Sequence, residues 1–112
     1  MGLDMYAFKS NGKDKPVEIF YWRKHPDLHG FMERLYRRRG GTGQFNCEDG
    51  VDLTPADIDA LEEAVTKNRL PHTEGFFFGQ SFPEHKEQDL QFIKAAREAL
   101  AEGCTVFYTS WW

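Results

Sequence analysis

Residues 17–36, VEIFYWRKHPDLHGFMERLY, contain the change of pattern that decides the fold. Up to residue 24 the run is rich in β-branched and aromatic residues, which favours a strand. After Pro26, which suits the first turn of a helix, apolar residues recur at the spacing of one helical face. A strand followed directly by an amphipathic helix predicts an α+β domain. The helical apolar positions are Leu28, Phe31, Met32, Leu35 and Tyr36.

A strand and a turn precede this stretch. Residues 2–9 alternate between two sets of side chains, which is the period of a strand. The tract from Asn11 to Pro16 is typical of a turn, because glycine permits a positive φ and proline fixes φ. We therefore expect residues 2–9 and 17–24 to form an antiparallel hairpin.

Two more helices are expected downstream. Thr54 is a good N-cap and Pro55 suits the first helical position, so a helix is predicted over residues 55–69, after a short strand at 51–53. The last helix should begin between Ser81 and Gln88, since Ser81 and Glu84 have the spacing of a capping box. Its expected apolar face consists of Leu90, Ile93, Ala96 and Leu100.

The C-terminal run TVFYTSWW, residues 105–112, predicts a terminal strand, and the glycine-bounded run GFFFG at 75–79 predicts a short buried strand or turn. The expected architecture is thus a small mixed sheet with an N-terminal hairpin and a C-terminal strand. About three helices should pack on this sheet. We expect one globular domain over residues 1–112.

Composition and charge narrow the classes of protein. The 112 residues are 15% aromatic and carry a formal net charge of −4, which argues against a dedicated nucleic-acid-binding protein. No window approaches the roughly 18 apolar residues of a membrane-spanning helix, and the N-terminus lacks the pattern of a secretory signal. We therefore expect a cytoplasmic protein with no membrane partner, in which Cys47 and Cys104 stay as buried thiols.

Basic residues are concentrated between Arg23 and Arg39, where six of them stand against two acidic residues. Arginine suits phosphate because its planar fork donates two parallel hydrogen bonds, and Trp22 could add a planar stack. However, alternation along the strand places Arg23 and Lys24 on opposite faces, and the cluster at 37–39 lies roughly 20 Å away at the far end of the helix. An anion site and a merely solvated surface both remain open.

His25 and His29 are one helical turn apart, so both should point to one edge of the apolar face of the helix. With Asp4 they could offer three metal ligands, but the HExxH pattern of zinc enzymes is missing. We predict no metal and no cofactor. The alternatives are that His25 caps the helix and His29 makes a structural hydrogen bond, or that one of them acts as an acid or base.

Aromatic residues gather in three places, at the end of the second strand, in GFFFG and at the C-terminus. Alternation of the terminal strand puts Phe107, Thr109 and Trp111 on one face and Tyr108 on the other. Aromatics left outside the core would form a homodimer interface or line a ligand groove. A purely structural core is the alternative.

Two functions are compatible with these residues. The first is a small binding or interaction module that holds a protein partner, a second copy or a small ligand. The second is an enzyme acting on a phosphate-bearing or nucleotide-like substrate, with His25 or His29 as acid or base and Arg23 as anion clamp. Neither Ser81 nor Ser110 lies in a GxSxG elbow, so a serine nucleophile is not indicated. The predicted ligand-binding residues are Trp22, Arg23, His25, His29, Phe77, Tyr108 and Trp111.

Seven blocks of sequence, spread over most of the chain, resemble a known group of proteins. They are MGLDMYAF, YWRKHPDLHGFMERLY, FN, LTPADIDALE, LPHTEGFFFG, DLQFIKAAREAL and VFYTSWW. In combination they resemble a family of small uncharacterised proteins of bacteria and their phages that open with GLDMY. The resemblance implies a recurring architecture and no mechanism. Some members are labelled phosphoglycerate kinase, a two-domain enzyme several times longer, whereas this chain has no GxxxxGK[ST] loop to hold phosphates.

Overall fold

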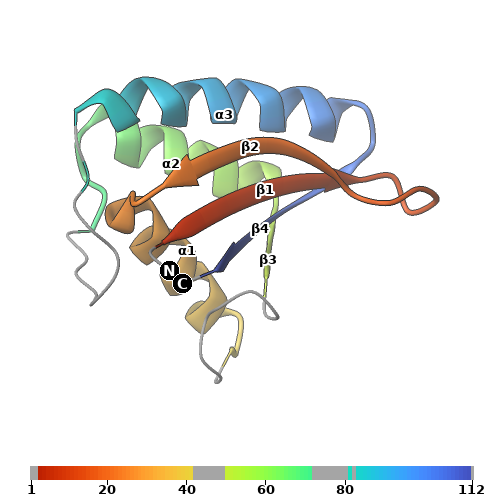
Figure 1. Ribbon diagram of the computed structural model, residues 1–112, viewed down its shortest axis with the longest axis horizontal. Coiled ribbons are helices and arrows are strands. Elements are labelled where there is room, and N and C mark those ends of the chain that lie inside the picture. The colour runs from red at the N-terminus through yellow and green to blue at the C-terminus, as the bar shows by residue number, and fades with distance from the viewer. Residues whose placement is uncertain (1–2, 42–49, 72–80, 82, 112) are drawn as a thin grey trace.

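The computed structural model describes residues 3–41, 50–71, 81 and 83–111 (Figure 1). Three helices and a four-stranded sheet confirm the expected α+β class. The strand or turn predicted at 75–79 lies outside the described residues, as do Phe77 within it and Trp112 at the end of the chain. In chain order the elements are β1 (Asp4–Ser10), β2 (Val17–Arg23), α1 (Pro26–Arg38), β3 (Val51–Leu53), α2 (Pro55–Thr66), α3 (Glu84–Ala101) and β4 (Thr105–Trp111).

The strands lie in the order β2-β1-β4-β3, and all three neighbouring pairs are antiparallel. The predicted hairpin of β1 and β2 is confirmed, but the expectation of a mixed sheet is wrong. The antiparallel direction of β4 follows from the position at which α3 ends. Lys9 near the end of β1 pairs with Glu102 just after α3, so β4 enters the sheet at the hairpin end and runs back along β1.

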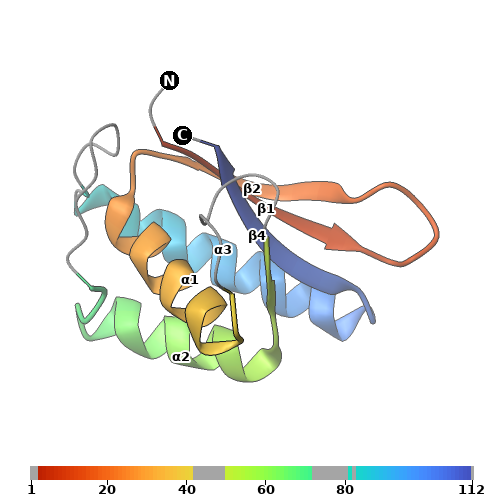
Figure 2. The same ribbon diagram turned by 90° about the horizontal axis from the view of Figure 1, so that it is seen from below.

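The two faces of the sheet differ because side chains alternate along each strand. Leu3, Met5 and Ala7 point to the helix side and are fully buried, as are Val106 and Tyr108 of β4. All three helices lie on this side of the strands, while the tip of the β1–β2 hairpin projects beyond them (Figure 2). No helix of the described ranges lies on the opposite face of the sheet.

The predicted helix starts hold for α1 and α2. Pro26 and Pro55 each occupy the first helical turn. Thr54 and Asp57 form a reciprocal capping box, in which each side chain accepts the backbone N–H of the other residue. Burial alone would raise the pKa of Asp57, but the hydrogen bonds from Thr54 and from Arg39 hold it below its usual value. The helix ends at Thr66, three residues before the predicted end.

The buried face of α3 differs from the prediction. Leu90 was expected on the apolar face and is exposed, whereas Asp89 beside it is buried. The capping box is also wrong, because the N-cap position is Pro83 and Ser81 bonds elsewhere. None of the helices in the described ranges is long and apolar enough to cross a membrane. The buried residues of α3 are His85, Asp89, Phe92, Ile93, Ala96 and Ala99.

Candidate functional site

The helix-free face of the sheet carries a continuous set of aromatic rings. Tyr6 packs against Phe8 and Tyr21, with ring centroids 6.2 and 5.4 Å apart. Phe8 stacks on Phe107 of β4 at 5.4 Å and an interplanar angle of 20°. Trp111 lies on the same face opposite Asp4 and is 57% exposed, while Tyr21 is 44% exposed. We call these five residues the open aromatic face.

A polar group closes one end of the open aromatic face. The hydroxyl of Tyr21 donates to Asp4 Oδ1 at 2.6 Å, and Arg23 Nε lies 3.9 Å from the same oxygen. The hydrogen bond to Asp4, helped by partial burial, raises the pKa of Tyr21 to about 12. Tyr21 therefore stays a neutral donor at physiological pH and holds the carboxylate in place.

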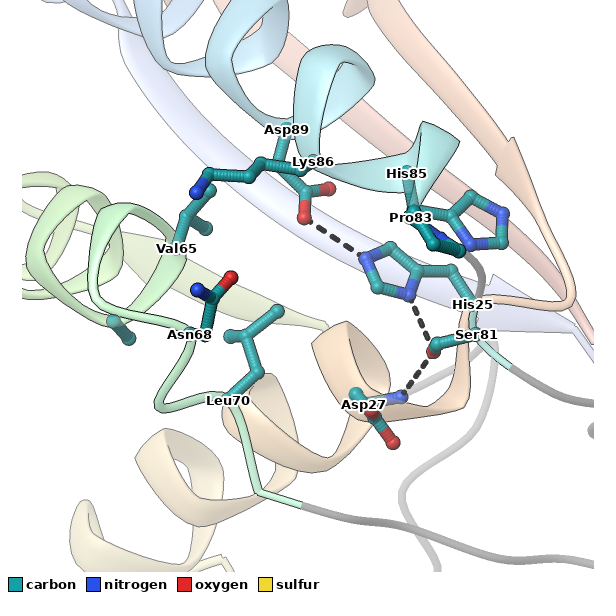
Figure 3. A pocket seen from close by; sticks show the side chains of 11 residues that line it. His25, Asp27, Val65, Asn68, Leu70, Ser81, Pro83, His85, Lys86 and Asp89 are labelled. Atoms are coloured by element: carbon teal, nitrogen blue, oxygen red, sulfur yellow. Dashed lines mark hydrogen bonds and ion pairs between the residues drawn. The ribbon is translucent and has the colours of Figure 1, made fainter.

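A pocket of about 390 Å³ lies on the helix side, where the starts of α1 and α3 meet the end of α2 (Figure 3). Its walls are part apolar and part polar, which is typical of small-ligand sites. The lining residues are His25, Asp27, Ala64, Val65, Asn68, Leu70, Ser81, Pro83, His85, Lys86 and Asp89.

One wall of this pocket is a chain of hydrogen bonds that joins three elements. His25 Nε2 lies 2.9 Å from Asp89 Oδ2, and His25 Nδ1 lies 2.7 Å from Ser81 Oγ. Trp22 Nε1 donates to the other carboxylate oxygen of Asp89 at 3.1 Å. Ser81 Oγ also accepts the backbone N–H of Asp27, in the first turn of α1. Ser81 thus caps α1 from a distant segment, and the side chain of His25 makes no cap bond.

His85 stacks on His25 with ring centroids 4.2 Å apart and nearly parallel planes. Burial lowers the pKa of His85, and the neighbouring His25 ring lowers it further. His85 is therefore a neutral ring at physiological pH and packs as a flat surface behind His25. Among the described residues no three His, Cys, Asp or Glu side chains are grouped to hold a metal ion.

His29 does not reach the pocket. It is buried, and its Nδ1 lies 2.7 Å from the hydroxyl of Tyr108 in β4. Burial lowers the pKa of His29 to about 4 and raises the pKa of Tyr108 well above its ordinary value. Both groups are therefore neutral in the folded protein, which agrees with the structural hydrogen bond that was one reading of the sequence.

The structure divides the sequence-predicted site residues among three places. Trp22, His29 and Tyr108 are in the core. Arg23 lies at the end of the open aromatic face, with Trp111 on the neighbouring side of β1. Those two flank Asp4 from opposite sides, Arg23 in β2 and Trp111 in β4, so they lie on one face of the sheet with β1 between them.

His25 alone of the predicted residues lines the described pocket, and Phe77 lies outside the described residues. Trp22 cannot provide the planar stack for a phosphate, because it is 1% exposed. Arg23 cannot clamp an anion beside His25, because its side chain is on the other face of the sheet. The single site expected to contain Arg23 and both histidines does not form.

The arginines at the end of α1 interact with nearby groups. Arg37 donates to Gly41 O and pairs with Glu33, and its guanidinium lies 5.2 Å from the ring centre of Tyr36. Arg39 pairs with Asp57 at the start of α2. These contacts favour the solvated-surface reading of the cluster over an anion site.

Sequence reasoning missed Ser81, His85 and Asp89. Ser81 was assigned to the start of α3, and the predicted apolar face of that helix began at Leu90 and did not include His85 or Asp89. A signal was present, because positions 85, 89, 92, 96 and 99 follow one another at spacings of four and three, which is one helical face. The two polar residues of that face, His85 and Asp89, lie in the first turns of α3, where the helix borders the pocket and not the apolar core.

Neither a family model, nor a curated protein, nor a solved structure matches the chain. Its function has to be inferred from the side chains described above.

Proposed function

We propose that the protein is a small binding module whose working surface is the open aromatic face, and that this face binds another protein chain. The observation that supports this most directly is the set of aromatic rings on the helix-free side of the sheet. Contiguous exposed apolar patches on small proteins usually mark contact sites. Tyrosine, tryptophan and arginine also dominate the binding energy of protein interfaces, and Tyr21, Trp111 and Arg23 all lie on this face.

The charges around the open aromatic face favour a protein over a nucleic acid. Aromatic platforms also stack nucleobases, but such sites need cationic groups along the phosphate backbone. The strand register places three carboxylates on this face. Asp4 pairs with Arg23 and Trp111, Glu18 pairs with Phe8, and Asp52 pairs with Phe107. Arg23 is the one described cation paired in register with them. The excess of negative charge would repel phosphates.

The face is complementary to a second copy of itself. Consider a two-fold axis that runs across the strands at the level of Tyr6. Arg23 is level with Asp4 and Glu18 is level with Phe8, so the axis brings Arg23 of one copy opposite Glu18 of the other. The same rotation places Trp111 opposite Phe107 and Tyr6 opposite Tyr6. Asp4 comes opposite Phe8. The rotation thus joins opposite charges at Arg23 and Glu18 and aromatic rings at Trp111, Phe107 and Tyr6, as an isologous interface of self-complementary surfaces requires.

We therefore take the partner to be a second copy, in a weak dimer. Three strands of seven residues span about 23 Å by 14 Å, a small area among protein interfaces. Light scattering and sedimentation over protein concentrations up to about 1 mM should show dimer formation that increases with concentration. A protein that remains monomeric throughout this range would exclude the proposal.

A charge-swap cycle tests the geometry of the contact. Arg23→Glu and Glu18→Arg should each weaken the dimer by about tenfold, since each swap places like charges together at two symmetry-related positions. The double variant should restore association, because the pairs are then reversed. Lys13→Glu, in the exposed hairpin turn, makes the same charge change as Arg23→Glu and should have no effect. Failure of the double variant to recover would exclude this arrangement.

A further inference from the structure

In the hydrogen-bonded wall of the pocket, the donors and acceptors of Trp22, Asp89 and His25 determine on which atom each hydrogen lies. The indole N–H of Trp22 can only donate, so Asp89 Oδ1 accepts from it. The ionised carboxylate is an acceptor on its other oxygen as well, so His25 Nε2 carries the hydrogen toward Asp89 Oδ2. In the neutral tautomer of His25 that this arrangement selects, Nδ1 is unprotonated and accepts the hydroxyl hydrogen of Ser81.

The oxygen of Ser81 is placed where negative charge is stabilised. Its hydroxyl hydrogen points to His25, while the oxygen accepts the backbone N–H of Asp27 at 3.1 Å. That N–H belongs to the first turn of the 13-residue helix α1, whose dipole favours negative charge at this end. An alkoxide that develops on Ser81 is thus stabilised by a donor and a dipole already in place.

Ser81 is also accessible, because it is only partly buried and lines the pocket together with His25 (Figure 3). The volume of about 390 Å³ admits a small acyl ester. Val65 and Leu70 provide apolar wall, while Asn68 and Lys86 bring hydrogen-bond donors to the same space. The combination of an apolar wall with donors suits a short acyl chain and its carbonyl oxygen.

We propose that Ser81 is a nucleophile for acyl transfer from small esters, with His25 as its general base and Asp89 as the residue that positions His25. A serine, a histidine and a carboxylate in hydrogen-bonded sequence are the arrangement that activates a hydroxyl for attack. Here the ring presents Nδ1 to the serine and Nε2 to the carboxylate, the reverse of the order in serine proteases. Proton transfer needs only an unprotonated nitrogen at hydrogen-bond distance, and the 2.7 Å contact provides it.

The reaction proceeds in two balanced halves. The Ser81 oxygen attacks the ester carbonyl carbon while its proton passes to His25 Nδ1. The bond from that carbon to the alkoxy oxygen breaks, and the leaving alcohol takes the proton from His25. Water then attacks the acyl group on Ser81, gives a proton to His25, and releases the carboxylic acid as Ser81 regains its proton.

The pocket lies on the opposite side of the sheet from the open aromatic face, so this activity and the binding proposal can fail separately. The test is labelling of the folded wild-type protein with a fluorophosphonate, which serine nucleophiles attack at phosphorus with loss of fluoride. Intact mass should increase by one phosphonyl group, and peptide mapping should place it on Ser81. Hydrolysis of p-nitrophenyl acetate should show the same dependence on Ser81.

Variants separate chemistry from folding. Ser81→Ala should remove the label, and Ser10→Ala, in β1 away from the pocket, should keep it. Asp89→Asn should slow labelling at least about 100-fold, because an amide that donates to Nε2 leaves the hydrogen on Nδ1 and removes the base. Thermal unfolding of each variant shows whether it is folded, and labelling of the wild type does not depend on that control.

The outcomes are decisive in both directions. A stoichiometric adduct on Ser81 that forms only in the folded protein and decreases with Asp89→Asn supports the proposal. Absence of an adduct on Ser81 in the folded wild type would overturn it. An adduct that forms equally fast in urea, or on another residue, would overturn it as well.

Discussion

Acidification should destabilise this protein through His29. The ring is buried against the hydroxyl of Tyr108, and burial lowers its pKa to about 4. In the unfolded chain the same group titrates near 6.5. At a pH between about 4 and 6.5 the imidazole of His29 is protonated in the unfolded chain and neutral in the folded protein, so lowering the pH favours unfolding. The stabilising contribution is present at pH 7 and is lost as the pH falls from 6.5 toward 4.

The size of the effect follows from the two pKa values. Between pH 7 and pH 5 the free energy of unfolding should fall by roughly 2 kcal/mol through His29 alone. His85 adds a change of the same sign, because burial and the adjacent His25 lower its pKa as well. The contribution of His29 therefore has to be measured as a difference between two proteins.

The measurement is urea unfolding of the wild type and of His29→Gln at pH 7 and pH 5. Glutamine can still bond to the hydroxyl of Tyr108 but does not titrate. The wild type should lose about 2 kcal/mol more than the variant on going from pH 7 to pH 5, since all other titrating groups are common to both. Equal losses in the two proteins would refute the reasoning, because His29 would then have the same proton affinity in both states.

Four further substitutions test core packing, helix capping and a close backbone contact. Phe92→Ala should destabilise the protein by about 3–5 kcal/mol in urea unfolding, whereas Leu90→Ala two residues earlier should change stability by less than about 1 kcal/mol, since only Phe92 is buried. Thr54→Ala should lower the melting temperature through loss of the cap, about 1 kcal/mol, and an unchanged value would mean that the capping box contributes nothing. Gly50→Ala should also lower it, because the added Cβ would lie 2.9 Å from the backbone oxygen of Tyr108. A stable Gly50→Ala protein would contradict that close approach.

Local sequence patterns were enough to predict most elements of the fold. The start of α1 at Pro26 and of α2 at Pro55 follow from proline geometry and, for α2, from Thr54 as a good N-cap residue. The β1–β2 hairpin follows from alternation on both sides of a turn tract, and β4 from its β-branched and aromatic residues. Strand order and direction could not be derived this way, because they depend on where α3 ends relative to the hairpin.

The α+β class and the high aromatic content can be read from the chain alone, because strand alternation, helical spacing and helix caps each act over a few neighbouring residues. Only the tertiary structure decided which side chains meet. It separated His25 from His29 and Arg23, and it joined His25 to Ser81 and Asp89, which are 56 and 64 residues away. It also placed every helix of residues 3–41, 50–71 and 83–111 on one face of the sheet. Contacts over such separations depend on the rotation of each helix about its axis. In α3 one helical spacing runs through Leu90 and another through Asp89, and packing against the rest of the protein decides which of the two is buried.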